Sequence, residues 1–268
     1  MGKIMRRIVE FAYATSNLVG TLDDGNGEAG LLIVSGGNEI RIGAHRSMAA
    51  LAQTIATKGY PVFRFDRRGI GDSEGANDGF ESSGPDISTA LAAFRAECPQ
   101  VKRIVAFGNC DAATALILHA ADVDHFILAN PWVVEPIDDL PPPAAIKSHY
   151  LRRLKDPSAW RALVAGKLNI RNAIRGLRRI SATDAAPQAL TERVANALAH
   201  DHRPTTILLA SGDITAIAFV DAWDGKNFEQ ARARPNLMLK HIDSSSHSFA
   251  SDADFAILVE TLRVALAQ

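Results

Sequence analysis

The chain of 268 residues contains only two cysteines, Cys98 and Cys110. Secreted disulfide frameworks need more cysteines, and zinc sites need close pairs such as C-x-x-C, so neither is expected here. No stretch approaches the roughly 20 apolar residues that a membrane-spanning helix requires. The basic N-terminal segment is also not followed by the apolar run of a signal peptide. We therefore expect a cytoplasmic protein without an integral membrane segment.

The chain also lacks an excess of charge of one sign. Its 29 basic and 30 acidic residues give a formal net charge of −1, which argues against a nucleic-acid partner because such proteins usually carry a basic excess. Gly69-Ile70-Gly71 lacks the third glycine and the helix of a dinucleotide-binding motif. His200 and His202 suggest a metal site, but no further ligand cluster accompanies them. The sequence predicts neither a cofactor nor a metal.

Short apolar runs alternate with helix-like segments along most of the chain. The runs lie at 31–34, 61–65, 103–107, 125–129, 206–210 and 237–242, and each ends in turn residues. Such aliphatic runs without clean alternation are typical of strands buried on both faces of a parallel sheet. Helices are expected over 47–58, 86–97, 112–121 and 249–266. This order predicts an α/β fold with a mostly parallel sheet covered by helices on both faces, and 8–22 predicts an antiparallel edge hairpin.

One segment departs from this alternation. From 131 to 203 no strand-like run occurs, and arginine-rich helical patterns follow the three prolines at 141–143. An all-helical insertion between two strands predicts a lid over the C-terminal ends of the strands, where open α/β sheets bind ligands. We therefore expect a core formed by 1–130 and 204–268 and a helical lid at 131–203. Most of its arginines are expected on solvated helix faces, and one or two could meet an anionic substrate group.

Cys110 lies in a turn between an expected strand and an expected helix. The segment Gly108-Asn109-Cys110-Asp111-Ala112 has the spacing G-x-C-x-A, close to the G-x-S-x-G of a sharp turn that presents a nucleophile. The small flanking residues allow the backbone to approach closely, and a helix N-terminus with a nearby imidazolium favours the reactive thiolate. On this motif alone, a small buried cysteine at a tight turn is an equally good interpretation.

A cysteine nucleophile also needs a base and a group that orients the base. His247 follows the last expected strand, and Asp213 follows the strand before it. Both should therefore lie on the same sheet edge as Cys110, in the chain order nucleophile, acid, histidine. Asp243 is an alternative acid. Three features on one edge in that order favour a triad over a packing explanation.

The segment from Phe65 to Gly75 resembles the D-x-R-G-x-G-x-S-x-G signature of the α/β-hydrolase superfamily. Together with the Cys110 turn, Asp213 and His247, the resemblance spans essentially the whole chain and implies an α/β-hydrolase fold. Further matches at Gly36-Gly37, 42–46 and Cys110-Asp111 resemble the hydrolases associated with the exosortase A system. Those hydrolases are encoded with bacterial exopolysaccharide and protein-sorting genes. The cysteine nucleophile is also similar to that of dienelactone hydrolases.

The resemblance implies a role for each matching residue. The triad would be Cys110, His247 and Asp213. The oxyanion hole would use the backbone N–H of Asp111 and a second donor from the loop after the first core strand, either Gly37 or Asn38.

Three side chains near this expected site have more than one interpretation. The Asp111 side chain is expected to stabilise the start of the following helix. His45 and Arg46 begin a helix beside the oxyanion loop, where they could bind substrate or serve as capping or surface residues.

These residues predict attack by the Cys110 thiolate on an acyl carbonyl, with His247 as the proton-transfer group and Asp213 fixing its tautomer. The expected reaction is hydrolysis of a small-molecule ester or thioester through a cysteinyl-acyl intermediate. Such intermediates are often slow to hydrolyse in serine-type scaffolds, so acyl transfer to a glycan or lipid-linked precursor is an alternative. A non-catalytic binding module on a hydrolase fold is a second alternative. The sequence leaves the oligomeric state open.

Overall fold

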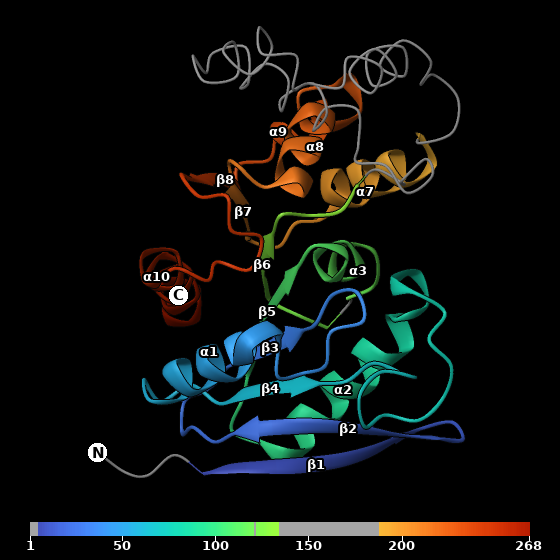
Figure 1. The fold of residues 1–268 in the computed structure, drawn as a ribbon, viewed down its shortest axis with the longest axis vertical. Coiled ribbons are helices and arrows are strands. Elements are labelled where there is room, and N and C mark those ends of the chain that lie inside the picture. Colours follow the sequence, from blue (N-terminus) through green and yellow to red (C-terminus); the bar gives the residue numbers. More distant parts are fainter. Residues whose placement is uncertain (1–4, 121, 134–187) are drawn as a thin grey trace, which may run out of the picture.

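The computed structural model describes residues 5–120, 122–133 and 188–268 (Figure 1). Within these residues the strands form one sheet in the order β1-β2-β4-β3-β5-β6-β7-β8. The first two strands form an antiparallel hairpin, and β2 is also antiparallel to β4, whereas every other neighbouring pair is parallel. The strand bounds are β1 Arg6–Tyr13, β2 Ser16–Asp23, β3 Ala29–Val34, β4 Val62–Phe65, β5 Arg103–Asn109, β6 His125–Ala129, β7 Thr205–Ala210 and β8 Leu237–Ile242. The predicted mostly parallel sheet with an edge hairpin is confirmed.

Helices cover both faces of this sheet. Figure 1 shows α1 (Ser47–Ala56) and α10 (Asp252–Ala267) on one side, and α2 (Gly84–Glu97), α3 (Asp111–His119) and α7 (Gln188–His200) on the other. Along β3, Leu31 and Ile33 pack into the core under α1 and α10, while Leu32 and Val34 pack into the core on the opposite face. Side chains alternate between the faces of a strand, so burial of both faces explains the unbroken apolar runs.

The connection from β7 to β8 contains helices that the apolar pattern did not predict. It folds into α8 (Ile214–Trp223), the short 3-10 helix η3 (Lys226–Phe228) and α9 (Glu229–Arg232). The segment of α8 is apolar on nearly all sides and therefore carries little of the 3.6-residue periodicity that reveals a surface helix. The remaining 3-10 helices are η1 (Ala44–Arg46) and η2 (Phe80–Ser82).

The expected helical lid at 131–203 lies mainly outside the described residues, which omit 134–187. Its described part includes α7, which packs against α3 and α9. The assignment of 131–203 as a lid therefore stays a prediction. In the part of the chain that the structure describes, no helix combines the length and the apolar character needed to cross a membrane.

Buried charges join the edge hairpin to the parallel part of the sheet. Arg64 of β4 is 1% exposed, and its Nη2 donates to Asp23 Oδ2 of β2 at 3.2 Å. Arg41 is also buried, and its guanidinium donates to Thr21 Oγ1 at 2.9 Å and pairs with Asp66. Asp66 begins the hydrolase-like signature, so this part of the signature stabilises the fold rather than reaching a substrate. Because each buried charge has a partner, the network avoids the large cost of an uncompensated buried ion.

Candidate active site

Cys110 occupies a one-residue turn between β5 and α3. Its backbone angles are φ 60° and ψ −126°, a region that non-glycine residues rarely adopt and that costs about 1–3 kcal/mol. The Cys110 N–H donates to Ala129 O at 2.9 Å, and the Trp132 N–H donates to Cys110 O at 3.2 Å. A Cβ atom at Gly108 would lie 2.8 Å from the backbone of Ala112, so this position requires glycine. The turn therefore holds a half-buried thiol at the N-terminus of α3.

Asp213 and His247 meet at the same edge of the sheet. Asp213 precedes α8, and its Oδ1 accepts the N–H groups of Thr215 and Ala216, both at 3.1 Å. Its Oδ2 lies 3.0 Å from His247 Nδ1. Burial opposes ionisation of Asp213, but the hydrogen bond and charge of His247 and the two N–H groups outweigh it, so the pKa of this carboxyl lies below its ordinary value. The aspartate is thus an anion fixed on both oxygens.

The His247 ring connects this anion to the sulfur of Cys110. Its hydrogen bond to Asp213, followed by its hydrogen bond to Cys110, raises the pKa of His247 to about 10, although burial acts in the opposite direction. Asp213 and Cys110 therefore both favour a proton on the His247 ring. The structure brings together the three side chains that the sequence proposed as a triad.

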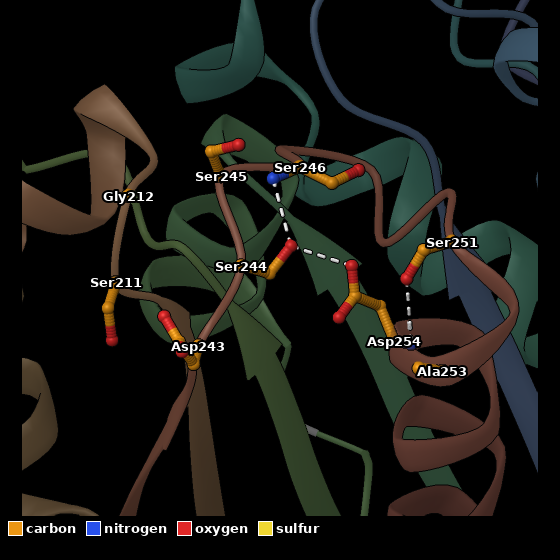
Figure 2. Close-up of a pocket in the computed structure, with 9 residues that line it drawn as sticks. All are labelled: Ser211, Gly212, Asp243, Ser244, Ser245, Ser246, Ser251, Ala253 and Asp254. Carbon is orange, nitrogen blue, oxygen red and sulfur yellow. Dashed lines mark hydrogen bonds between the residues drawn. The ribbon is translucent and has the colours of Figure 1, made fainter.

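Asp243, the alternative acid, lies apart from the hydrogen bond between Asp213 and His247. It lines a hollow of about 790 Å³, and His247 is not among the lining residues. Figure 2 shows these residues between the turn after β7 and the N-terminus of α10. Asp243 is exposed and makes no hydrogen bond to His247. In the same hollow, Ser244 Oγ donates to Asp254 Oδ2 at 2.6 Å and accepts the Ser246 N–H at 3.0 Å. The hydrogen bond between Ser244 and Asp254 therefore anchors the loop before His247 to α10.

The loop after β3 is bound to the first turn of α3. The Gly37 N–H donates to Asp111 Oδ1 at 2.6 Å, and the Arg67 guanidinium donates to Gly37 O and lies 3.9 Å from Asp111 Oδ2. The Asp111 side chain was expected to serve its own helix, but it reaches across to this loop instead. Gly37 therefore already uses the N–H that was a candidate oxyanion donor. The Asn38 N–H makes no hydrogen bond to a described residue, and neither does the Asp111 N–H.

His45 and Arg46 lie beside this loop at η1 and are exposed. Both have left-handed backbones, with φ 51° and φ 64°, which residues with side chains adopt at a cost. Their side chains make no hydrogen bond or ion pair to the described residues. Their proposed role in substrate binding stays a prediction.

The histidine pair at the end of α7 does not gather metal ligands. His200 Nδ1 lies 2.8 Å from Asn196 O, and the carbonyl oxygen of His202 accepts from Asn236. Among the residues at 5–120, 122–133 and 188–268, no group of three or more His, Cys, Asp or Glu side chains is arranged to hold a metal ion.

Two asparagines that the sequence analysis did not select lie against His247. Asn109 Nδ2 donates to the backbone oxygen of His247 at 3.0 Å, and Asn130 Nδ2 donates to the same oxygen at 3.2 Å. Asn109 ends β5 and Asn130 follows β6, so both occupy C-terminal strand ends on the edge of the triad. That position is the signal that could have identified them.

A family model supports this assignment of the fold. The model described as serine aminopeptidase, S33, matches residues 26–210, which is more than half of the chain. The chain belongs to this S33 hydrolase family. The matched part of this S33-family chain includes Cys110 and the loop at Gly37, whereas Asp213 and His247 lie beyond it. No curated protein matches the chain.

Solved structures agree with the fold of this S33-family enzyme at low sequence identity. The Pyrococcus furiosus esterase Pf2001 is 16% identical with a TM-score of 0.66, and the alignment covers 97% of this chain and 92% of the esterase. A complex of DcsB with its substrate analogue is 14% identical with a TM-score of 0.62, covering 97% and 98%. The thioesterase domain from the curacin biosynthetic pathway is 12% identical with a TM-score of 0.56, covering 97% and 99%. These likenesses show the α/β-hydrolase fold.

Proposed function

We propose that this S33-family chain hydrolyses esters or thioesters of small molecules, with Cys110 as the nucleophile. The observation that carries the proposal is the 3.0 Å hydrogen bond between His247 and Asp213. It lies at the sheet edge where Cys110 occupies a strained turn at a helix N-terminus and interacts with the His247 ring. A cation and a helix N-terminus both favour negative charge on a sulfur. The esterase and thioesterase named among the similar structures support this reaction class.

The reaction divides into acylation and deacylation. The Cys110 sulfur attacks the acyl carbon, a C–S bond forms, and the bond to the leaving alcohol or thiol breaks as His247 supplies the proton. The neutral ring then takes a proton from water, which attacks the cysteinyl thioester and releases the carboxylic acid. The sulfur regains its negative charge and His247 remains protonated. Asp213 holds the ring in the required tautomer and stabilises the imidazolium.

The negative oxygen of each tetrahedral intermediate needs donors that face it. We assign this role to the backbone N–H groups of Asp111 and Asn38, because the Gly37 N–H is already bonded to a carboxylate. Donors of this kind typically contribute about 3–4 kcal/mol of transition-state stabilisation. Asp111 then has two roles: its backbone binds the oxyanion, and its side chain holds the loop that carries Asn38.

The finer features of the proposal come from the sequence. The matches at Gly36-Gly37, 42–46 and Cys110-Asp111 favour the branch associated with the exosortase A system, acting in the cytoplasm. In that branch, a polar glycan or lipid-linked acyl acceptor would compete with water. His45 and Arg46 are the proposed substrate contacts, since both side chains are exposed and lie beside the oxyanion loop.

Turnover of p-nitrophenyl acetate and of a simple acyl thioester tests the proposal. Wild type should release product, and acid-quenched samples should carry an acyl adduct on the peptide that contains Cys110. Cys110→Ala should show neither, while Cys98→Ala serves as the matched control and should behave like wild type. Turnover that appears only when a glycan acceptor is added would replace hydrolysis by acyl transfer. Absence of both turnover and adduct with every donor would favour a binding module.

A further inference from the structure

A pair of amide side chains supports the backbone of His247. Asn109 Nδ2 and Asn130 Nδ2 donate to the carbonyl oxygen of His247 at 3.0 and 3.2 Å. Asn130 Nδ2 also donates to Asn109 Oδ1 at 3.2 Å, so the two amides form a unit, which we call the amide pair. Two donors on one carbonyl fix the position of the residue that bears the imidazole.

Asn130 is built into the sheet rather than placed on its surface. It is 0% exposed, and its φ of 41° is in the left-handed region, which asparagine tolerates better than most residues. Its Oδ1 accepts the Ala210 N–H at 2.9 Å, and its own N–H donates to Leu208 O at 2.9 Å. A buried amide costs free energy unless its donors and acceptor are satisfied, and here they are. Satisfied buried networks of this kind rigidify their surroundings.

The amide pair connects the turns that carry all three triad residues. Asn109 immediately precedes Cys110, and Ala210 lies at the end of β7, just before the turn that presents Asp213. His247 is bonded through its carbonyl. The beginning of the His247 loop has a separate anchor, the Ser244 and Asp254 hydrogen bond visible in Figure 2. The loop is therefore held at its start by α10 and at His247 itself by the amide pair.

We propose that Asn109 and Asn130 are positioning residues that set the distance and orientation of the His247 ring relative to Cys110 and Asp213; this inference rests on the proposed function. Only an amide meets the requirement at Asn130, where one end must donate to two oxygens while the other accepts an N–H. A carboxylate at either position places an oxygen where the His247 carbonyl needs a donor. The ring would then shift, and a misplacement near 1 Å costs about 100-fold in rate.

The test compares Asn109→Asp and Asn130→Asp with wild type. Asn227→Asp is the matched control, because Asn227 is exposed and makes no side-chain hydrogen bond to the described residues. For both test variants, kcat on p-nitrophenyl acetate should fall about 100-fold while KM stays within about threefold. The control should keep wild-type kinetics. Circular dichroism and urea unfolding report whether each variant is folded, and half-buried Asn109 provides a second variant should Asn130→Asp fail to fold.

Two further readouts separate positioning from a merely structural role. A protonated aspartic acid can donate to the His247 carbonyl, so the ratio of variant to wild-type kcat should rise as the pH falls. In NMR spectra, the Nδ1 proton of His247 should shift in both test variants and not in Asn227→Asp. This spectroscopic change is expected whether or not the test ester is a good substrate.

Kinetics within twofold of wild type in folded Asn109→Asp, with an unshifted His247 Nδ1 proton, would overturn the inference. So would a loss of kcat that follows only the loss of folded protein. The proposed function fails on a different result, namely full activity of Cys110→Ala. An inactive Cys110→Ala beside a fully active Asn109→Asp would leave the proposed function standing and remove only the role of the amide pair.

Discussion

The two cysteines of this chain occupy opposite ends of neighbouring helices. Cys98 follows the last turn of α2, is 3% exposed and belongs to the hydrophobic core. Burial raises the pKa of Cys98 to about 11, and the nearby charge of Asp24 acts in the same direction. Cys110 lies at the N-terminus of α3, is half-buried, and interacts with the His247 ring.

The contrast shows that position rather than residue type decides what a thiol can do. A helix C-terminus carries partial negative charge and a helix N-terminus carries partial positive charge, so only the second favours a sulfur anion. Cys98 also has a relaxed backbone, with φ −131°, whereas Cys110 has φ 60°. One cysteine fills space, and the other is held under strain beside a proton-transfer group.

The largest expected effect separates the two cysteines by activity. Cys110→Ala should lower kcat/KM by about 10⁴-fold or more, because loss of a triad nucleophile leaves only binding and the oxyanion hole. Cys98→Ala should stay within about twofold of wild type, because Cys98 contacts no reacting group. Initial rates on p-nitrophenyl acetate measure kcat/KM for both variants. Equal losses in the two variants would break the comparison.

A second prediction concerns chemical reactivity without a substrate. Iodoacetamide at pH 7 should alkylate Cys110 about 100-fold faster than Cys98, since the thiolate is the reacting form and Cys98 is buried. His247→Gln should slow labelling of Cys110 and leave Cys98 unchanged. Peptide mass spectrometry over a time course gives both rates. Slow and equal labelling of both thiols in wild type contradicts the assignment.

When the free energy of unfolding is measured instead of activity, substitution of Cys98 should have the larger effect. Cys98→Ser should lower the free energy of unfolding by about 1–3 kcal/mol, because it buries a hydroxyl in an apolar site. Cys110→Ser should change it by less than about 0.5 kcal/mol, because that side chain is only half-buried. Urea unfolding followed by circular dichroism measures both, with wild type as the reference. A larger loss in Cys110→Ser would show that the turn depends on the sulfur for its stability.

The last prediction concerns the pH dependence of stability. The folded state raises the pKa of His247 from 6.5 to about 10, so its contribution to stability is complete below pH 6.5 and is lost as the pH rises to 10. For Cys98 the corresponding window runs from 9.0 to about 11. The free energy of unfolding of wild type should therefore exceed that of His247→Gln by less as the pH rises from 6.5 to about 10. Its excess over Cys98→Ala should shrink as the pH rises from 9.0 to about 11. The His247 effect is reduced by solvent, because 42% of its side chain is exposed. Urea unfolding at pH 6, 8, 10 and 11 measures both, and an advantage over His247→Gln that grows between pH 6.5 and 10 would contradict the first expectation.

Much of the fold could be predicted because it follows from hydrophobic runs and connection rules. The apolar segments located the core strands, and parallel order then placed the residues after β5, β7 and β8 on one edge. That reasoning was enough to bring Cys110, Asp213 and His247 together as candidates. It could not identify α8, whose apolar composition hides its helical period.

The contacts within the site could not be predicted in the same way. The hydrogen bond from Gly37 to Asp111 joins residues 74 positions apart, and that from Asn109 to His247 joins residues 138 positions apart. Such bonds depend on side-chain rotamers and on loop paths, which a single sequence does not encode as a pattern. The same holds for Arg64, because an arginine is normally expected at the surface. Its burial depends on the hydrogen bond to Asp23 on the neighbouring strand.

The ion pair between Asp23 of the hairpin and Arg64 of β4 limits how far this chain can be shortened. The family match begins at residue 26, after β2 has ended, so a fragment cut at the boundary of the match would omit the hairpin. A fragment cut there would lose Asp23 and leave the guanidinium of Arg64 inside the protein without its counter-ion. We expect such a fragment to be recovered only as aggregate, because the hairpin Arg6–Asp23 belongs to the smallest folding unit.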